Sequence, residues 1–167
     1  ASALPPASGL RAIVSGSCSQ ATNAQVAHFI AGGGVAHVLD PLRLTRDRAG
    51  AVAEALALAE AQLPSGPVLI YSTAEPMAVA AVQAQLGTEG AGALVEQALA
   101  EVAQGLLRLG VRQLVVAGGE TSGAVVQALG VRRTQTGQQT DPGVPWCHAV
   151  GNDGPLHLAL KSGNFGS

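Results

Sequence analysis

One segment constrains the fold of this chain more than any other. The apolar run Leu114–Ala117 is followed at 118–123 by Gly-Gly-Glu-Thr-Ser-Gly. This pattern predicts a buried strand that turns sharply into a helix over 122–129, with Thr121 or Ser122 as the helix cap. The paired glycines permit backbone torsions barred to other residues and allow close approach to the main chain. The free N–H groups at such a helix start are suited to bind phosphate.

A second strand–turn–helix of similar build lies near the N-terminus, where the apolar segment 12–14 runs into the serine-rich loop 15–19. The hydroxyls of Ser15 and Ser17 can either bind phosphate or cap the following helix. In open α/β sheets, ligands gather beyond the carboxyl ends of the strands, where both loops would lie. Two such loops in one small unit favour a nucleotide site more than either loop does alone.

Three charged residues each allow two interpretations. Glu120 can reach a magnesium ion or a ribose hydroxyl, or it is a favourable negative charge in the first turn of a helix. Asp40 ends a predicted strand roughly where dinucleotide folds place a ribose-binding acid, but Asp before Pro also forms a good turn. Lys161 is the only lysine of the chain. It could meet a phosphate, or it is the solvated end of a strand.

Apolar strand segments alternate with helical segments over the first 130 residues, which predicts a parallel sheet between layers of helices. Strands are expected over 11–15, 35–39, 67–71 and 113–117, and helices over 23–31, 46–63, 76–86, 90–109 and 122–129. Beyond Gly130 three β-prone segments follow, at 131–140, 144–150 and 156–160. We therefore predict a three-layer α/β/α fold with a mostly parallel sheet and a strand-rich C-terminal extension that makes the sheet mixed. Residues 10–167 are predicted to form one domain after a linker over 1–9.

Composition excludes several classes of function. The chain has 167 residues, of which 47% are hydrophobic, so it is not a disordered segment. Aromatic residues make up 2% and the net charge is −2, which argues against nucleic-acid binding. No apolar run is long enough to span a membrane. Cys18 and Cys147 form no C-x-x-C pair, and we expect reduced thiols in a cytoplasmic protein.

Taken together, these segments resemble the C-terminal, nucleotide-binding domain of the four-carbon acid sugar kinase family, which includes 3-oxo-tetronate, threonate and erythronate kinases. The similarity follows nearly the whole chain in order and spacing. The segments that carry it are the serine loop 15–19 with Thr22 and Gln25, the glycine loop 116–125, the turn 141–146, and Leu158-Ala159-Leu160-Lys161-Ser162-Gly163-Asn164-Phe165-Gly166.

The resemblance implies transfer of the ATP γ-phosphate to a hydroxyl of a four-carbon acid sugar, with ATP or ADP and Mg²⁺ as ligands. It implies nucleotide binding by the loop Gly118, Gly119, Glu120 and Thr121, by Ser17 or Ser15, and by Gly163. In the family, an N-terminal domain binds the sugar acid and carries the catalytic aspartate. No catalytic residue is therefore expected in this chain, which we predict to be the C-terminal half of a two-domain kinase and inactive alone.

Two other functions stay open at this stage. One is a stand-alone α/β nucleotide-binding module without catalysis. The other is the dinucleotide-binding domain of an oxidoreductase, against which the absence of G-x-G-x-x-G argues. The sugar acid is not fixed by the sequence, and neither is the oligomeric state, for which a homo-oligomer is one alternative.

Overall fold

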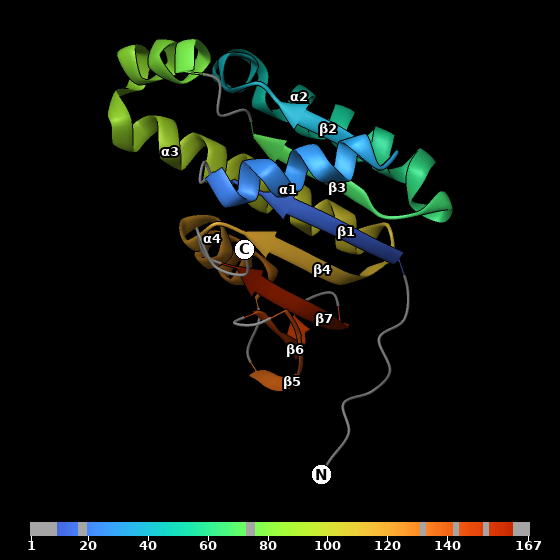
Figure 1. The fold of residues 1–167 in the computed structure, drawn as a ribbon. Helices are drawn as coiled ribbons and strands as arrows, with labels where there is room; N and C mark the ends of the chain where they lie inside the picture. The colour runs from blue at the N-terminus through green and yellow to red at the C-terminus, as the bar shows by residue number, and fades with distance from the viewer. Residues whose placement is uncertain are drawn as a thin grey trace.

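The computed structural model describes residues 10–16, 20–72, 76–130, 133–141, 144–151 and 154–161 (Figure 1). The linker predicted over 1–9 lies outside the described residues. The elements in chain order are β1 (Leu10–Ser15), α1 (Gln20–Ala31), β2 (Val35–Leu39), α2 (Pro41–Gln62), a short 3-10 turn (Leu63–Ser65), β3 (Val68–Ser72), α3 (Pro76–Arg108), β4 (Val111–Ala117), α4 (Gly119–Leu129), β5 (Arg133–Asp141), β6 (Val144–Gly151) and β7 (Gly154–Lys161).

The seven strands form one sheet in the order β2-β3-β1-β4-β7-β6-β5. The pairs from β2 through β3, β1 and β4 to β7 are parallel, whereas β7-β6 and β6-β5 are antiparallel. The predicted mixed sheet with a strand-rich C-terminal extension is therefore confirmed. The extension widens the sheet beyond β4 at the lower edge of the molecule in Figure 1.

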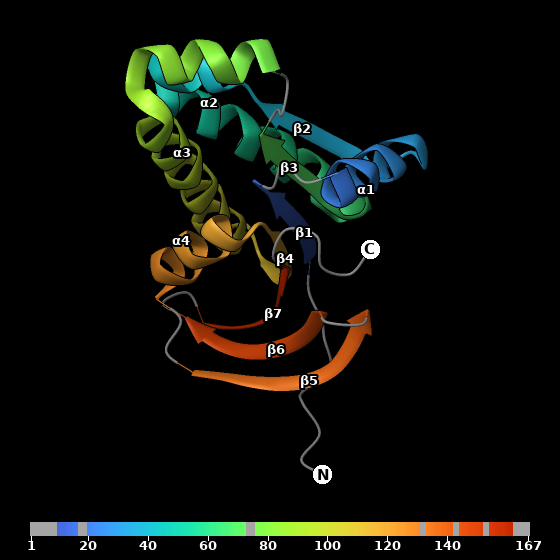
Figure 2. The same ribbon diagram turned by 60° about the vertical axis from the view of Figure 1, so that its left-hand side comes forward.

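The helices lie in two layers of unequal size. α2, α3 and α4 cover one face of the sheet and bury Val14, Ile70 and Leu114 against apolar side chains such as Leu99 and Leu106 of α3. Among the described helices α1 alone lies on the opposite face (Figure 2). Right-handed crossovers require this arrangement, because the chain leaves β1 toward one edge of the sheet and leaves β3 and β4 toward the other. The predicted α/β/α layering is confirmed.

One helix begins earlier than predicted, and another breaks at the predicted position. α2 starts at Pro41 rather than at 46, because the side chain of Asp40 accepts a hydrogen bond from the backbone N–H of Leu42 (3.0 Å) and Pro41 suits the first helical position. Asp40 is thus a helix cap, as expected of an Asp-Pro turn. The predicted separation of the helices 76–86 and 90–109 is confirmed, because α3 leaves helical torsions at Gly87, where φ is 77°.

Candidate functional site

The two glycine-containing loops lie at the point where the sheet reverses its winding. β1 and β4 are adjacent and parallel, so their last residues, Ser15 and Ala117, are register partners. The helices that follow these strands, α1 and α4, pack on opposite faces of the sheet. Such a switch point leaves a crevice beyond the strand ends, and open α/β sheets bind their ligands there.

The first loop begins in direct contact with the start of α4. The backbone N–H of Gly16 donates a hydrogen bond to the carbonyl of Ala117 (3.0 Å). A Cβ atom on Gly16 would lie 2.1 Å from Oγ1 of Thr121 and 2.9 Å from Cδ1 of Leu99. Ser15 and Thr121 are both buried. Position 16 therefore requires glycine, because the chain passes too close to the first turn of α4 for any larger residue.

The start of α4 corrects the prediction of its cap. The helix begins at Gly119 with Gly118 as N-cap (φ 110°), and no described side chain caps it. Thr121 and Ser122 lie inside the first turn, where the N–H of Ser122 donates to the carbonyl of Gly118 (2.8 Å). The prediction failed because a glycine with positive φ turned the chain into the helix before a hydroxyl residue was reached. A helix start without a side-chain cap keeps its first N–H groups available to an anion.

The structure brings four of the predicted binding residues to this edge of the sheet: Ser15, Gly118, Glu120 and Thr121. Gly119 is the first residue of α4. Ser17 and Gly163 lie outside the described residues. β7 ends at the same edge, with Lys161 as the register partner of Ala117.

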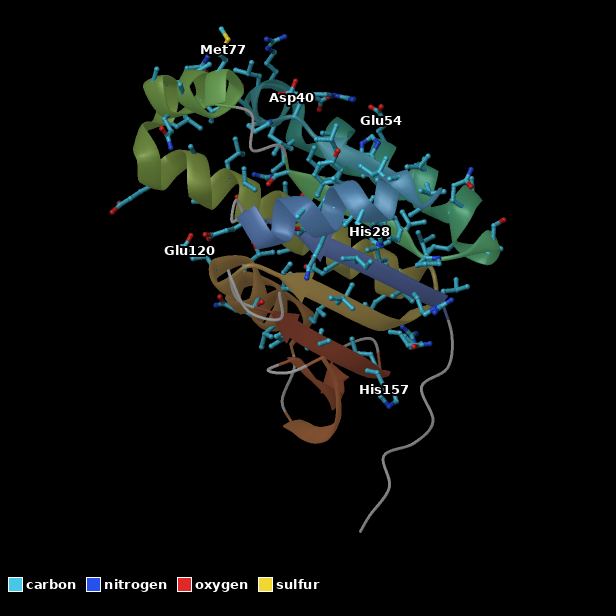
Figure 3. All side chains as sticks on the ribbon, viewed as in Figure 1. His28, Asp40, Glu54, Met77, Glu120 and His157 are labelled. Carbon is cyan, nitrogen blue, oxygen red and sulfur yellow. The ribbon has the colours of Figure 1, made fainter. Side chains whose placement is uncertain are left out.

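The structure adds a second carboxylate to the site. Glu96 of α3 is hydrogen-bonded to the side chain of Glu120, which lies at the start of α4 beside α3 (Figure 3). Partial burial raises the pKa of Glu96, and the hydrogen bond with Glu120 and the negative charge of Glu120 raise it further. Within the described residues, including this site, no group of three or more acidic, histidine or cysteine side chains is placed to hold a metal. Glu96 and Glu120 are thus a pair of carboxylates that α3 and α4 bring together beside the start of α4.

Sequence reasoning missed Glu96, Gly16 and Leu99 as parts of the site. Glu96 and Leu99 belong to a long apolar helix and carry no motif. Gly16 stands in the serine loop, but only its contact with Thr121 reveals why it is glycine. α3 thus adds residues to a site whose other members come from the end of β1, the loop after it and the start of α4.

Replacing Glu96 with glutamine is expected to stabilise the protein at neutral pH and to have little effect near pH 4. The pKa of Glu96 in the folded protein lies above its ordinary value of 4.5, so folding favours the protonated form of this carboxyl. The contribution of Glu96 to stability is therefore fully present below pH 4.5 and is lost as the pH rises through the folded-state pKa. At pH 7 to 8, Glu96→Gln should raise the free energy of unfolding by about 0.2–1 kcal/mol, the range measured for charge pairs near the surface. Urea unfolding between pH 4 and 8 measures this effect.

The control for that series is Glu89→Gln, an exposed glutamate about two turns earlier on α3. It removes one negative charge but leaves Glu96 and Glu120 in place. If Glu89→Gln reproduced the whole pH dependence, the net charge of the chain and not the paired carboxyls would be responsible.

Comparison with known proteins agrees with this geometry. The family model described as nucleotide-binding C-terminal domain matches residues 12–167. The chain belongs to this family. It is 54% identical over 167 residues to a 3-oxo-tetronate kinase of Burkholderia multivorans and 55% identical over 166 residues to one of Pseudomonas fluorescens. The resemblance to the C-terminal domain of the four-carbon acid sugar kinases is confirmed.

These relatives are longer than the chain. The matches cover 100% and 99% of the chain but 38% of each kinase. A solved structure of a Haemophilus influenzae protein agrees with the fold at a TM-score of 0.86 and 37% identity, and it covers 99% of this chain and 39% of that one. Within the described residues, none of the helices combines the length and hydropathy needed to cross a lipid bilayer.

Proposed function

We propose that this domain binds ATP in a kinase that transfers the γ-phosphate to a hydroxyl of a four-carbon acid sugar. The observation that carries the proposal is the contact between Gly16 and Thr121, by which the two loops meet at the switch point of the sheet. The kinase names of the relatives support the reaction type. The sugar acid would bind to a part of the protein outside this chain, so the chain supplies nucleotide binding and no catalytic base.

In this proposal, backbone N–H groups make most of the contacts with the nucleotide phosphates. Phosphoryl transfer needs in-line placement and neutralisation of charge more than covalent help. The N–H groups of Gly119, Glu120 and Thr121 would donate to the β- and γ-phosphates, and the dipole of α4 would favour their negative charge. The hydrogen bond from Gly16 N–H to the carbonyl of Ala117 would hold the two loops together. Closure against the sugar-acid domain would exclude water and prevent hydrolysis of ATP.

The residues present fit a magnesium ion. Mg²⁺ prefers oxygen ligands and is commonly held by one or two carboxylates together with substrate phosphates. Glu120, with Glu96 hydrogen-bonded to it, offers such carboxylates beside the helix start that would hold the phosphates. The bound ion would neutralise charge on the phosphates. A cation bound between them would offset the repulsion from Glu120 that raises the pKa of Glu96.

The proposal is tested by titration calorimetry of the full-length protein with Mg·ATP, Mg·ADP and NAD. We expect the adenine nucleotides to bind and NAD not to bind. Gly119→Val should weaken Mg·ATP binding at least about tenfold, a loss of 1.4 kcal/mol, since a branched side chain obstructs the approach of a phosphate to the amides. Gly123→Ala is the matched control: Gly123 is exposed on α4 and a Cβ there meets no atom within 4 Å.

Activity assays decide the reaction class. Phosphate transfer from ATP is measured with 3-oxo-tetronate, threonate and erythronate as acceptors, first with the full-length protein and then with this chain alone. Transfer only by the full-length protein supports the proposal. Binding of NAD in preference to ATP, or no nucleotide binding at all, would contradict it.

A further inference from the structure

β2 ends the sheet on the side opposite the C-terminal extension, and among the described strands it pairs with β3 alone (Figure 1). An edge strand leaves a row of backbone N–H and C=O groups unpaired, which proteins commonly protect with a charged residue, a proline or a bulge. Residues 35–39 read Val-Ala-His-Val-Leu, and their register with β3 is unbroken. β2 therefore has none of these protections and is an edge to which another strand can be added.

The side chains of β2 leave one apolar residue uncovered. Leu39 is buried in the core together with side chains of α2. Because side chains alternate between the two faces of a strand, Ala36 and Val38 lie on the opposite face from Leu39. Val38 is apolar and β-branched, yet it is 42% exposed. A strand placed beside β2 would cover it.

α2 places a pair of opposite charges beside the middle of this edge. The guanidinium of Arg43 donates a hydrogen bond to the carboxylate of Glu54, and both side chains are exposed. This hydrogen bond is the main cause that lowers the pKa of Glu54, and the charges of Arg43 and His37 lower it further. The effect of His37 places the carboxylate within electrostatic reach of the central residue of β2. Figure 3 shows Glu54 at the upper rim of the molecule.

We propose that β2 pairs with β2 of a second copy of this chain, in antiparallel orientation about a two-fold axis at His37. In that register Ala36 lies opposite Val38 of the second copy, and Val38 lies opposite its Ala36. Residues that are directly opposite in a pair of strands share a face, so each exposed valine meets a small apolar residue. The same surface of both copies is used, as a closed dimer requires.

The same axis brings the charges of the two copies together. An axis perpendicular to the sheet keeps α2 of both copies on one face, and Arg43 and Glu54 lie near His37, through which the axis passes. Arg43 of each copy then faces Glu54 of the other. Two positive and two negative charges alternate around the axis, so the surface is complementary to itself in charge as well as in hydrogen bonding.

Sedimentation equilibrium of the full-length protein tests the strand pairing. The unmodified protein should be a dimer. Val38→Lys should raise the Kd of that dimer at least about tenfold, because a lysine on an edge strand opposes the addition of another strand. Leu86→Lys is the matched control, since Leu86 is 46% exposed on α3 and not on β2, and it should leave the Kd unchanged. Circular dichroism of each variant verifies that the fold is retained.

Arg43→Glu and Glu54→Arg test the charges across the axis. Each variant alone sets like charges against each other in its own dimer and should raise the Kd about tenfold or more. A mixture of the two variants should form mixed dimers, because each contact across the axis then joins opposite charges. Capture of one variant by an affinity tag on the other measures this recovery. The pair within each chain stays broken in the mixture, so only contacts between chains account for it.

Three results would overturn the inference. A monomeric full-length protein would show that β2 does not bind a second copy, and that another part of the longer protein or solvent covers it. A dimer that resists Val38→Lys, or that Leu86→Lys disrupts equally, would place the interface elsewhere. Failure of the mixed variants to associate would show that the Arg43–Glu54 pair acts within one chain only. Nucleotide binding is measured separately, so none of these results bears on the proposed function.

Discussion

Replacing Gly16 with alanine is expected to lower the free energy of unfolding by about 1–3 kcal/mol, the usual cost of forcing extra atoms into a packed site. The new Cβ would lie 2.1 Å from Oγ1 of Thr121, whose side chain is buried and, being β-branched, is stiff at χ1. The clash falls where the two loops meet. We therefore also expect Mg·ATP affinity to fall by about a hundredfold, which corresponds to 2.7 kcal/mol.

A double-mutant cycle tests the cause of this loss. Thr121→Ala removes the atom that the new Cβ would strike, so Gly16→Ala should cost less stability in the Thr121→Ala background than in the unmodified protein. Urea unfolding of the four proteins measures the difference. Gly92→Ala is the matched control, since a Cβ there meets no atom within 4 Å. It should stabilise α3 by about 0.5–1 kcal/mol. Equal costs of Gly16→Ala in both backgrounds would show that Thr121 is not the obstacle.

Gly118→Ala is expected to have the second large effect. Gly118 has φ 110° and ψ 129°, a conformation that costs a residue with a Cβ about 1–3 kcal/mol. Relief of that strain would rotate the start of α4, because the carbonyl of Gly118 accepts the first helical hydrogen bond from Ser122. The N–H groups proposed to bind phosphate would move with it. Mg·ATP affinity should then fall by about a hundredfold.

The control is the glycine at the other end of the same helix. Gly130 caps α4 with φ 64°, so Gly130→Ala should cost about 1–2 kcal/mol of stability for the same kind of reason. It lies one helix length from the proposed phosphate site and should leave Mg·ATP affinity unchanged. Thermal melts and titration calorimetry of both variants give the comparison. Equal loss of affinity in the two variants would mean that global stability, not the geometry of the helix start, controls binding.

The sequence predicted the sheet well because strand identity depends on local signals. β2 was predicted at its observed bounds, 35–39, since an apolar run there stands between a glycine triplet and Asp-Pro. The layering followed from the alternation of strands and helices. The turn from strand to helix at 118–119 was predicted for the same reason, because two glycines stand there between an apolar run and a helical segment.

The rest depended on contacts between distant residues. The start of α4 was placed three residues late, because the positive φ of Gly118 is not visible in residue types. Glu96 gave no signal, since its partner Glu120 is 24 positions away and only the packing of α3 on α4 brings them together.

The unequal coverage of the sheet also bears on how easily each helix separates from it. α3 packs on the sheet through fully buried side chains such as Leu99, Leu106 and Leu107. α1 packs on the opposite face through Val26 and Phe29, which are only partly buried. Segments with few enclosed apolar contacts detach at a fraction of the energy needed to unfold a whole domain. The amide hydrogens of α1 are therefore expected to exchange with solvent faster than those of the enclosed part of α3.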